Sequence, residues 1–262
     1  MFHNLHLYHK IVRRLVQWRE SARITRVRNL ALLITGLSLG TGIHLADIVS
    51  AWPLASRDLS LVNRLRRFLT NTAVDVEAWY RPVAEQLVAP FAGQRIRLVI
   101  DATKVGFGHR LLVVGIAYRK RTLPLAWSVH EGVRGHTPVK AQRALFTRVA
   151  ALLPRDAEVW VLGDTEFQHV PLLRWFQKRG WHFVIRQKGA VKVYQQEQGW
   201  QKLNVFDLAE GETRYVGWVR LTQKHNAGWF WLLLHWEAGE DEPWYLISDR
   251  SGDWRLIRMY KV

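Results

Sequence analysis

Two apolar stretches of the chain end on a carboxylate, and they predict the centre of the fold. Residues 95–100 read Arg-Ile-Arg-Leu-Val-Ile and precede Asp101, and residues 158–163 read Glu-Val-Trp-Val-Leu-Gly and precede Asp164. Branched and aromatic residues favour β-strands, whereas Asp is disfavoured in a buried strand. If the two strands lie side by side and parallel, both carboxylates emerge at the sheet edge where open α/β folds bind ligands.

The elements between these stretches and after them predict an α/β fold with a mixed sheet. A basic turn after residue 118 indicates a hairpin, and Pro124 marks its second arm as an edge strand because proline cannot donate to a ladder. Thr137 and Pro138 form an N-cap and first-turn pair for a helix. The predicted strands are 95–100, 110–118, 123–130, 158–163 and 181–186, with helices at about 137–153 and 171–179.

From residue 188 the pattern changes to short strands rich in Trp, Tyr and Val. This change predicts an inserted β-subdomain in residues 188–250. Its tryptophans are interpreted as core residues or cross-strand pairs, with base stacking as the alternative. The predicted strands are 191–194, 213–221, 228–236 and 243–248.

The first 92 residues have helical periodicity throughout, and one of the predicted helices is sharply amphipathic. The predicted helices cover residues 5–28, 30–39, 43–52, 60–71 and 79–88. On the helix at 60–71, one face carries Leu61, Val62, Leu65, Phe68 and Leu69, and the other carries Asn63, Arg64, Arg66, Arg67, Thr70 and Asn71. This polar face has arginine and amide side chains and no acidic residue, which is suited to contacts with DNA phosphates and base edges. The alternative is that the basic face is merely solvated.

The charge of the chain points to a polyanionic partner. The 262 residues carry a net charge of +16, and the pI is about 10.6, which is typical of nucleic-acid-binding proteins. No run reaches the roughly 18 apolar residues of a membrane-spanning helix, so we expect no membrane partner. The chain contains no cysteine, which excludes disulfides and thiolate zinc sites. We therefore expect a cytoplasmic, nucleoid-associated protein that binds double-stranded DNA.

Four segments follow from these patterns. Residues 1–92 are predicted to form a helical DNA-binding region and residues 93–187 the first part of an α/β core. Residues 188–250 form the β-insertion, and residues 251–262 begin a further core helix.

The candidate chemistry lies at the predicted sheet edge. Two carboxylates held close together repel each other unless a cation lies between them, and Mg²⁺ is the usual cation for oxygen ligands, with Mn²⁺ as a substitute. Arg186 and Lys188 follow the fifth strand at the same edge, where they either contact a DNA phosphate or are solvated.

These features resemble the DDE transposases of bacterial insertion sequences. The resemblance rests on Asp101-Ala-Thr103, on Gly163-Asp164-Thr-Glu-Phe167, on the strand order and on a β-rich insertion after the fifth strand. It implies a ribonuclease-H-like core that cleaves and joins DNA at transposon ends. It also implies two Mg²⁺ ions, with Asp101 bridging both and Asp164 holding one, and a possible homodimer.

The resemblance also implies a third ligand, a Glu that follows a Tyr and an Arg on a helix. Tyr260 matches the Tyr of that motif, and only Lys261 and Val262 follow it. The interpretation is a chain truncated before the catalytic Glu, with an incomplete two-metal site. Glu166 could substitute for this ligand, with a surface or capping role as the alternative, and the acidic residues 240–242 are interpreted as a solvated turn. A non-catalytic DNA-binding remnant or inhibitor and a metal-dependent nuclease of the same fold remain as alternative functions.

Overall fold

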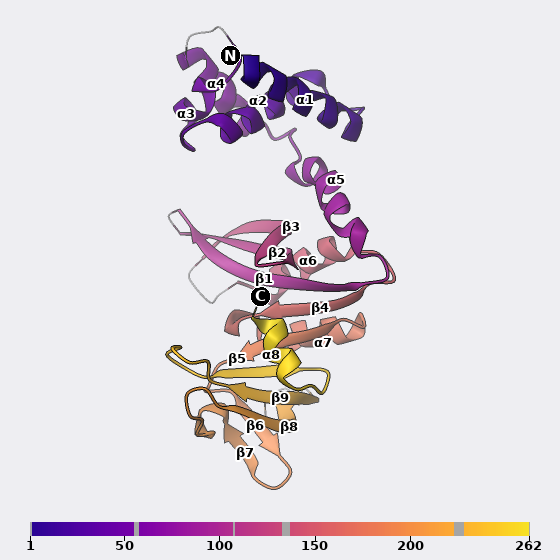
Figure 1. Ribbon diagram of the computed structural model, residues 1–262, viewed down its shortest axis with the longest axis vertical. Coiled ribbons are helices and arrows are strands. Elements are labelled where there is room, and N and C mark those ends of the chain that lie inside the picture. The colour runs from indigo at the N-terminus through magenta and orange to yellow at the C-terminus, as the bar shows by residue number, and fades with distance from the viewer. Residues whose placement is uncertain (1, 55–57, 107, 133–136, 223–227, 262) are drawn as a thin grey trace. The chain divides into compact units, whose positions relative to one another are not determined.

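The computed structural model describes residues 2–54, 58–106, 108–132, 137–222 and 228–261. Its contacts divide the chain into two compact units, Met1–Pro82 and Val83–Val262. The first is helical and the second is built around one large sheet (Figure 1).

The first unit is held together by apolar side chains from its helices. These helices are α1 (Phe2–Trp18), α2 (Ile24–Leu39), α3 (Leu45–Ser50) and α4 (Asp58–Leu69), followed by the start of α5 (Val76–Val88). As predicted, α4 buries Leu61, Leu65 and Phe68, which pack with Leu32 and Trp52. Leu69 of the same helix is 53% exposed, so the apolar face is narrower than predicted.

The continuous helix predicted over residues 5–28 is wrong. Helix α1 ends at Trp18, and α2 begins at Ile24, so it includes the predicted helix at 30–39. The Arg19 side chain explains the corner, because it donates to the Ala78 carbonyl at 3.1 Å and lies over the Trp79 ring. Ala78 and Trp79 lie far from Arg19 in the sequence, so these contacts could not be predicted. The turn after Trp18 also contains no Gly or Pro that would have indicated the end of the helix.

The second unit contains a ten-stranded sheet in the order β3-β2-β1-β4-β5-β10-β9-β8-β6-β7. Strands β1, β4 and β5 are mutually parallel, and the other neighbours are antiparallel. The strands are β1 (Arg95–Val105), β2 (His109–Tyr118), β3 (Arg121–Glu131), β4 (Glu158–Gly163), β5 (His182–Gln187), β6 (Lys192–Gln195), β7 (Gly199–Lys202), β8 (Thr213–Leu221), β9 (Trp229–His235) and β10 (Trp244–Ser248). The mixed α/β fold class and the edge position of β3 are thereby confirmed.

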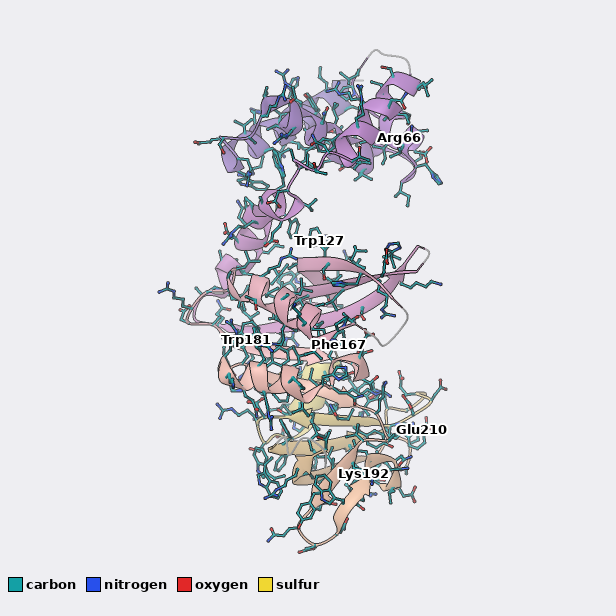
Figure 2. All side chains as sticks on the ribbon, turned by 180° about the vertical axis from the view of Figure 1, so that it is seen from behind. Arg66, Trp127, Phe167, Trp181, Lys192 and Glu210 are labelled. Atoms are coloured by element: carbon teal, nitrogen blue, oxygen red, sulfur yellow. The ribbon has the colours of Figure 1, made fainter. Side chains whose placement is uncertain are left out.

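Helices cover the two faces of this sheet differently. On one face, α6 (Val139–Ala150) and α7 (Val170–Lys178) pack through aromatic residues such as Phe146 and Phe176, which lie edge to face with ring centroids 4.8 Å apart. Phe167, labelled in Figure 2, is also fully buried. On the other face, the short helix α8 (Trp254–Tyr260) buries Leu256 and Ile257 against β4, β5, β9 and β10.

The strands after residue 188 continue the hydrogen-bonded ladder of the core. Strand β10 pairs with β5, placing Tyr245 opposite Gln187, and β9, β8, β6 and β7 follow outward. The four predicted strands are present, and β7 is an addition that the sequence did not indicate. Its Gly-Trp-Gln-Lys sequence lacks the apolar alternation on which strand prediction depends.

Candidate active site

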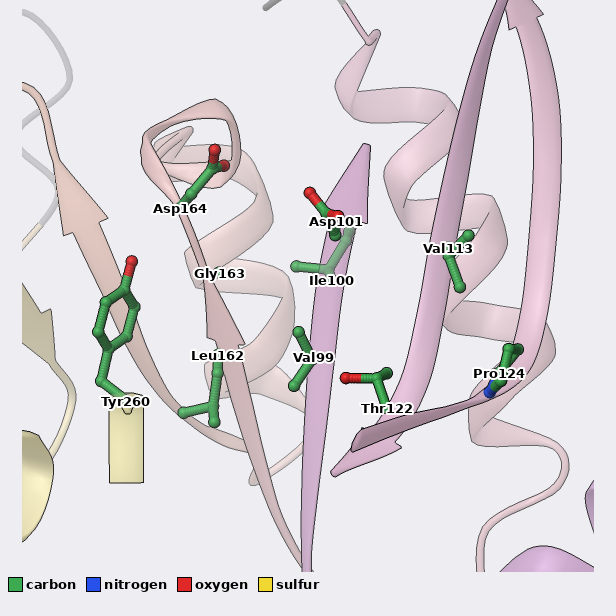
Figure 3. Close-up of a pocket in the computed structure, with 10 residues that line it drawn as sticks. All are labelled: Val99, Ile100, Asp101, Val113, Thr122, Pro124, Leu162, Gly163, Asp164 and Tyr260. Carbon is green, nitrogen blue, oxygen red and sulfur yellow. The ribbon is translucent and has the colours of Figure 1, made fainter. Parts of the chain in front are cut away.

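Asp101 and Asp164 are brought together by the register of two parallel strands. Ile100 of β1 lies opposite Gly163 of β4, so the next residue on each strand is one of the two carboxylates. Side chains two residues apart share a face, which places Asp101 with Val99 and Asp164 with Leu162. Both carboxylates lie at the same end of neighbouring strands, on the α8 side of the sheet (Figure 3).

The two carboxylates line a single cavity of about 380 Å³. Its lining is mainly apolar, and its polar side chains are the two carboxylates, the Tyr260 phenol and the Thr122 hydroxyl (Figure 3). The lining residues are Val99, Ile100, Asp101, Val113, Thr122, Pro124, Leu162, Gly163, Asp164 and Tyr260.

The expectation that both strands end at the carboxylates is correct for β4 and wrong for β1. Strand β1 continues through Asp101 to Val105, because its pairing with β2 persists after its pairing with β4 stops at Ile100. Asp101 therefore lies where the parallel ladder ends and the antiparallel hairpin continues. Asp164 instead follows the last residue of β4 and caps the 3₁₀ helix η2 (Thr165–Phe167).

One oxygen of each carboxylate is fixed by a backbone N–H. The Ala102 N–H donates to Asp101 Oδ1 at 2.7 Å, and the Glu166 N–H donates to Asp164 Oδ1 at 2.9 Å. Both side chains are exposed at the mouth of the cavity. The carboxylates are thus oriented by neighbouring backbone N–H groups while remaining accessible from solvent.

This donor set fits one hard divalent cation. Mg²⁺ is commonly held by one or two carboxylates, with water and substrate phosphate completing its octahedral shell. Among the described residues, no group of three or more His, Cys, Asp or Glu side chains could hold a metal ion. Asp101 and Asp164 are thus the residues that could hold one such ion, and a second ion would need a further anionic ligand.

Glu166 is not placed to supply that ligand. Its Oε2 accepts from Arg110 Nη2 at 2.9 Å, and its Oε1 accepts from the Thr137 hydroxyl at 2.7 Å. The Arg110 and Glu166 side chains are only 6% and 8% exposed. A buried carboxylate needs such partners, so the structure favours a structural role for Glu166 over metal ligation. Thr137 was predicted to cap α6. Its hydroxyl instead donates to Glu166, and Pro138 occupies the N-cap position of the helix.

Sequence reasoning missed Arg110, which connects the segments that carry the two carboxylates. Its Nη2 donates both to Glu166 and, at 2.7 Å, to the carbonyl of Ala102. Ala102 follows Asp101 on β1, and the Glu166 N–H donates to Asp164. One guanidinium therefore links strand β1 beyond its ladder with β4 to the helix η2. In the sequence, the only sign of this role is that Arg110 is a basic residue at the start of a predicted apolar strand.

Tyr260 reaches the cavity from α8. Asp253 caps this helix by accepting from the Arg255 N–H at 2.9 Å, and the Tyr260 ring packs edge to face on Trp244. Burial raises the pKa of Tyr260 to about 12, while the positive charge of Arg186 opposes this increase and the negative charge of Asp164 adds to it. The phenol is therefore protonated near neutral pH and can donate a hydrogen bond into the cavity.

The prediction that both Arg186 and Lys188 follow the fifth strand is correct for Lys188 and wrong for Arg186, because β5 continues through Arg186 to Gln187 and pairs there with β10. Ile185 lies opposite Gly163, so Arg186 is at the level of Asp164. The Arg186 guanidinium, 19% exposed, is paired with Glu242 at 2.7 Å. Lys188 is exposed, and its backbone N–H donates to Gln168 Oε1.

The arginines predicted on α4 divide into two kinds. Arg64 donates from Nε to Asn29 Oδ1 at 2.8 Å, which ties α4 to α2. Arg66, labelled in Figure 2, and Arg67 are exposed and line a surface hollow of about 610 Å³ together with Asn63. Arg66 and Arg67 are therefore the accessible cations of this face.

No helix within the described ranges is long and apolar enough to cross a membrane.

No curated protein matches the chain. Among solved structures, the chain is similar to the piggyBac transposase in a cryo-EM synaptic complex with hairpin DNA, with 11% identity and a TM-score of 0.47. That match covers 97% of this chain and 62% of the piggyBac chain. Residues 93–252, which contain both carboxylates, match the family model for the transposase DDE domain, and the chain therefore belongs to the DDE transposase family.

Proposed function

We propose that this chain catalyses metal-dependent cleavage and strand transfer at the ends of an insertion sequence. The observation that carries the proposal is the placement of Asp101 and Asp164 on one face of one cavity, through the Ile100–Gly163 register, within the family-matched residues. Double-stranded DNA of the transposon ends and the target is the proposed substrate, and a homodimer is the proposed assembly.

In this proposal, Asp101 and Asp164 hold Mg²⁺ or Mn²⁺ through the carboxylate oxygens that face the cavity. When bound, the ion supplies Lewis-acid activation of the attacking oxygen and stabilisation of the leaving oxygen. The Tyr260 phenol, with a pKa of about 12, donates a hydrogen bond to a phosphate oxygen and does not act as a base near neutral pH. Arg186 lies at the level of Asp164, where the phosphate would lie, and its pairing with Glu242 offsets part of the positive charge that it brings there.

We expect this 262-residue polypeptide to cleave DNA poorly, because its described residues supply the cavity with only two carboxylates. Two-metal catalysis requires ions roughly 3.5–4 Å apart, each with its own anionic ligands. The test is a cleavage assay in Mg²⁺ or Mn²⁺ on DNA that carries the ends of the element. The assay compares this chain with its Asp101→Asn and Asp164→Asn variants.

Wild type should cleave the DNA slowly, and both variants should lose this metal-dependent cleavage. Cleavage that persists in both variants would contradict the proposed site. Cleavage by wild type without joining would instead indicate a nuclease of the same fold.

A DNA-binding role independent of catalysis is favoured by α4, whose exposed Arg66 and Arg67 lie in a unit separate from the carboxylates. Each phosphate contact contributes about 0.9 to the slope of log affinity against log salt concentration. We therefore expect the double change Arg66→Gln and Arg67→Gln to reduce that slope by about 2, measured by fluorescence anisotropy on a duplex.

The matched control removes the same charge elsewhere, with Lys192→Gln and Lys202→Gln on the paired outer strands β6 and β7. The control should leave the slope unchanged. An identical slope for wild type and the Arg66 and Arg67 variant would show that this face is merely solvated.

A further inference from the structure

Four arginines converge on the α8 side of the sheet, away from the carboxylates. Arg95 and Arg97 are on β1, in phase with Asp101 but four to six residues before it, and Arg255 and Arg258 are on α8. Together with Trp254 and Met259 they line a groove of about 370 Å³. We call these four residues and Trp254 the arginine groove.

The positive charges of the arginine groove are only partly compensated. Arg95 makes a bidentate pair with Glu158 at 2.9 and 3.1 Å, and Arg255 lies 4.0 Å from Asp253. Neither Arg97 nor Arg258 has a carboxylate partner in the part of the chain that the structure describes. Two uncompensated cations therefore remain.

The surrounding packing keeps these cations close to one another. Leu256 and Ile257 fix α8 to the sheet, which holds Arg255 and Arg258 beside the β1 arginines. The Arg258 guanidinium lies 5.5 Å from the centroid of the Trp254 ring, and this ring is 49% exposed. Like charges from two elements held in one groove repel each other unless an anion binds between them.

We propose that the arginine groove binds the phosphate backbone of the DNA whose reacting phosphate lies at Asp101 and Asp164. This inference rests on the proposed function and adds a second contact region to it. Guanidinium groups suit phosphate because their planar donors bind its oxygens in pairs. Arg97 and Asp101 lie on the same face of the same strand, so a single duplex can lie along both.

The strand geometry sets the spacing along the DNA. A strand rises about 3.3 Å per residue, so Arg97 and Arg95 lie about 13 and 20 Å along β1 from Asp101. Duplex DNA advances about 3.4 Å per base pair. The arginine groove therefore contacts phosphates about four to six nucleotides from the reacting bond.

The first experiment changes the two uncompensated arginines in the full chain, as Arg97→Gln and Arg258→Gln. Duplex binding is measured across a salt series, and the slope of log affinity against log salt should fall by about 2. Mn²⁺ binding should match wild type, because neither residue lines the carboxylate cavity. The Lys192→Gln and Lys202→Gln variant again serves as the charge-matched control. An unchanged slope with a folded variant would overturn the proposal.

The second experiment measures the spacing directly. Because the chain has no cysteine, Arg255→Cys provides a single thiol for an iron chelate that cuts nearby DNA by hydroxyl radicals. Cuts centred about four to six nucleotides from the enzymatic cleavage site support the proposal. Cuts at other positions, or protection of the thiol by an acidic protein instead of DNA, would overturn the proposal.

The two proposals can fail separately. If Asp101 proves unnecessary for Mn²⁺ binding while the salt slope still falls in the arginine variant, the active-site proposal fails and the arginine groove remains a DNA site.

Discussion

Replacing Asp101 or Asp164 with Asn should weaken Mn²⁺ binding by at least about 100-fold and abolish metal-dependent DNA cleavage. Each substitution removes one of the two anionic ligands, and even second-shell changes cost 10–100-fold in metal affinity. The shape of the side chain is preserved, and the amide oxygen can still accept from the neighbouring backbone N–H. Titration of Mn²⁺ followed by electron paramagnetic resonance measures the affinity directly.

Asp156→Asn is the matched control for this titration. Asp156 is an exposed carboxylate before β4 and does not line the cavity, so its loss should leave Mn²⁺ affinity unchanged. If Asp101→Asn and Asp156→Asn bind Mn²⁺ equally well, the two family carboxylates do not form a metal site.

Replacing Arg110 with Met should lower the free energy of unfolding by about 3–5 kcal/mol. The change leaves the Glu166 carboxylate buried without its cation, and it removes the donor to the Ala102 carbonyl. Urea denaturation measures the loss. The double variant Arg110→Met and Glu166→Leu should recover part of it, because no unpaired charge then remains.

The exposed pair of Arg95 and Glu158 provides the comparison. Its side chains are 53% and 42% exposed, so Arg95→Met should cost at most about 1 kcal/mol. If Arg110→Met costs no more than Arg95→Met, the buried network does not stabilise the segments beside the carboxylates. Mn²⁺ binding by the folded Arg110→Met variant then tests orientation. Weaker binding indicates that Arg110 positions the segments that carry Asp101 and Asp164.

The apolar strands ending near Asp101 and Asp164 could be predicted because a carboxylate after a buried run is conspicuous. Their parallel pairing was only a condition of that prediction, and the structure shows that the condition is met. The Ile100–Gly163 register could not be predicted, because it depends on how the two strands pack against helices elsewhere. The continuation of β1 past Asp101 was missed for a related reason. It is stabilised by β2, which lies later in the chain.

The role of Glu166 could not be read from the sequence either. Glu166 is two residues after Asp164, which is close enough in the sequence for metal ligation. Only the structure shows that one of its carboxylate oxygens accepts from Arg110 and the other from Thr137. The same limit applies to Arg64, whose helical position matched Arg67 but whose guanidinium contacts Asn29 on another helix. Long-range partners decide which charged residues remain accessible.

We propose that Asp101 and Asp164 jointly hold one divalent ion at the DNA-cleaving site. Anomalous diffraction from crystals grown with Mn²⁺ and a short duplex tests this arrangement. The account predicts one strong manganese peak within about 2.0–2.2 Å of an oxygen from each carboxylate, with a DNA phosphate beside it. Manganese bound elsewhere, or carboxylate oxygens more than about 4.4 Å apart, would contradict it, because one ion could not then lie about 2.2 Å from both.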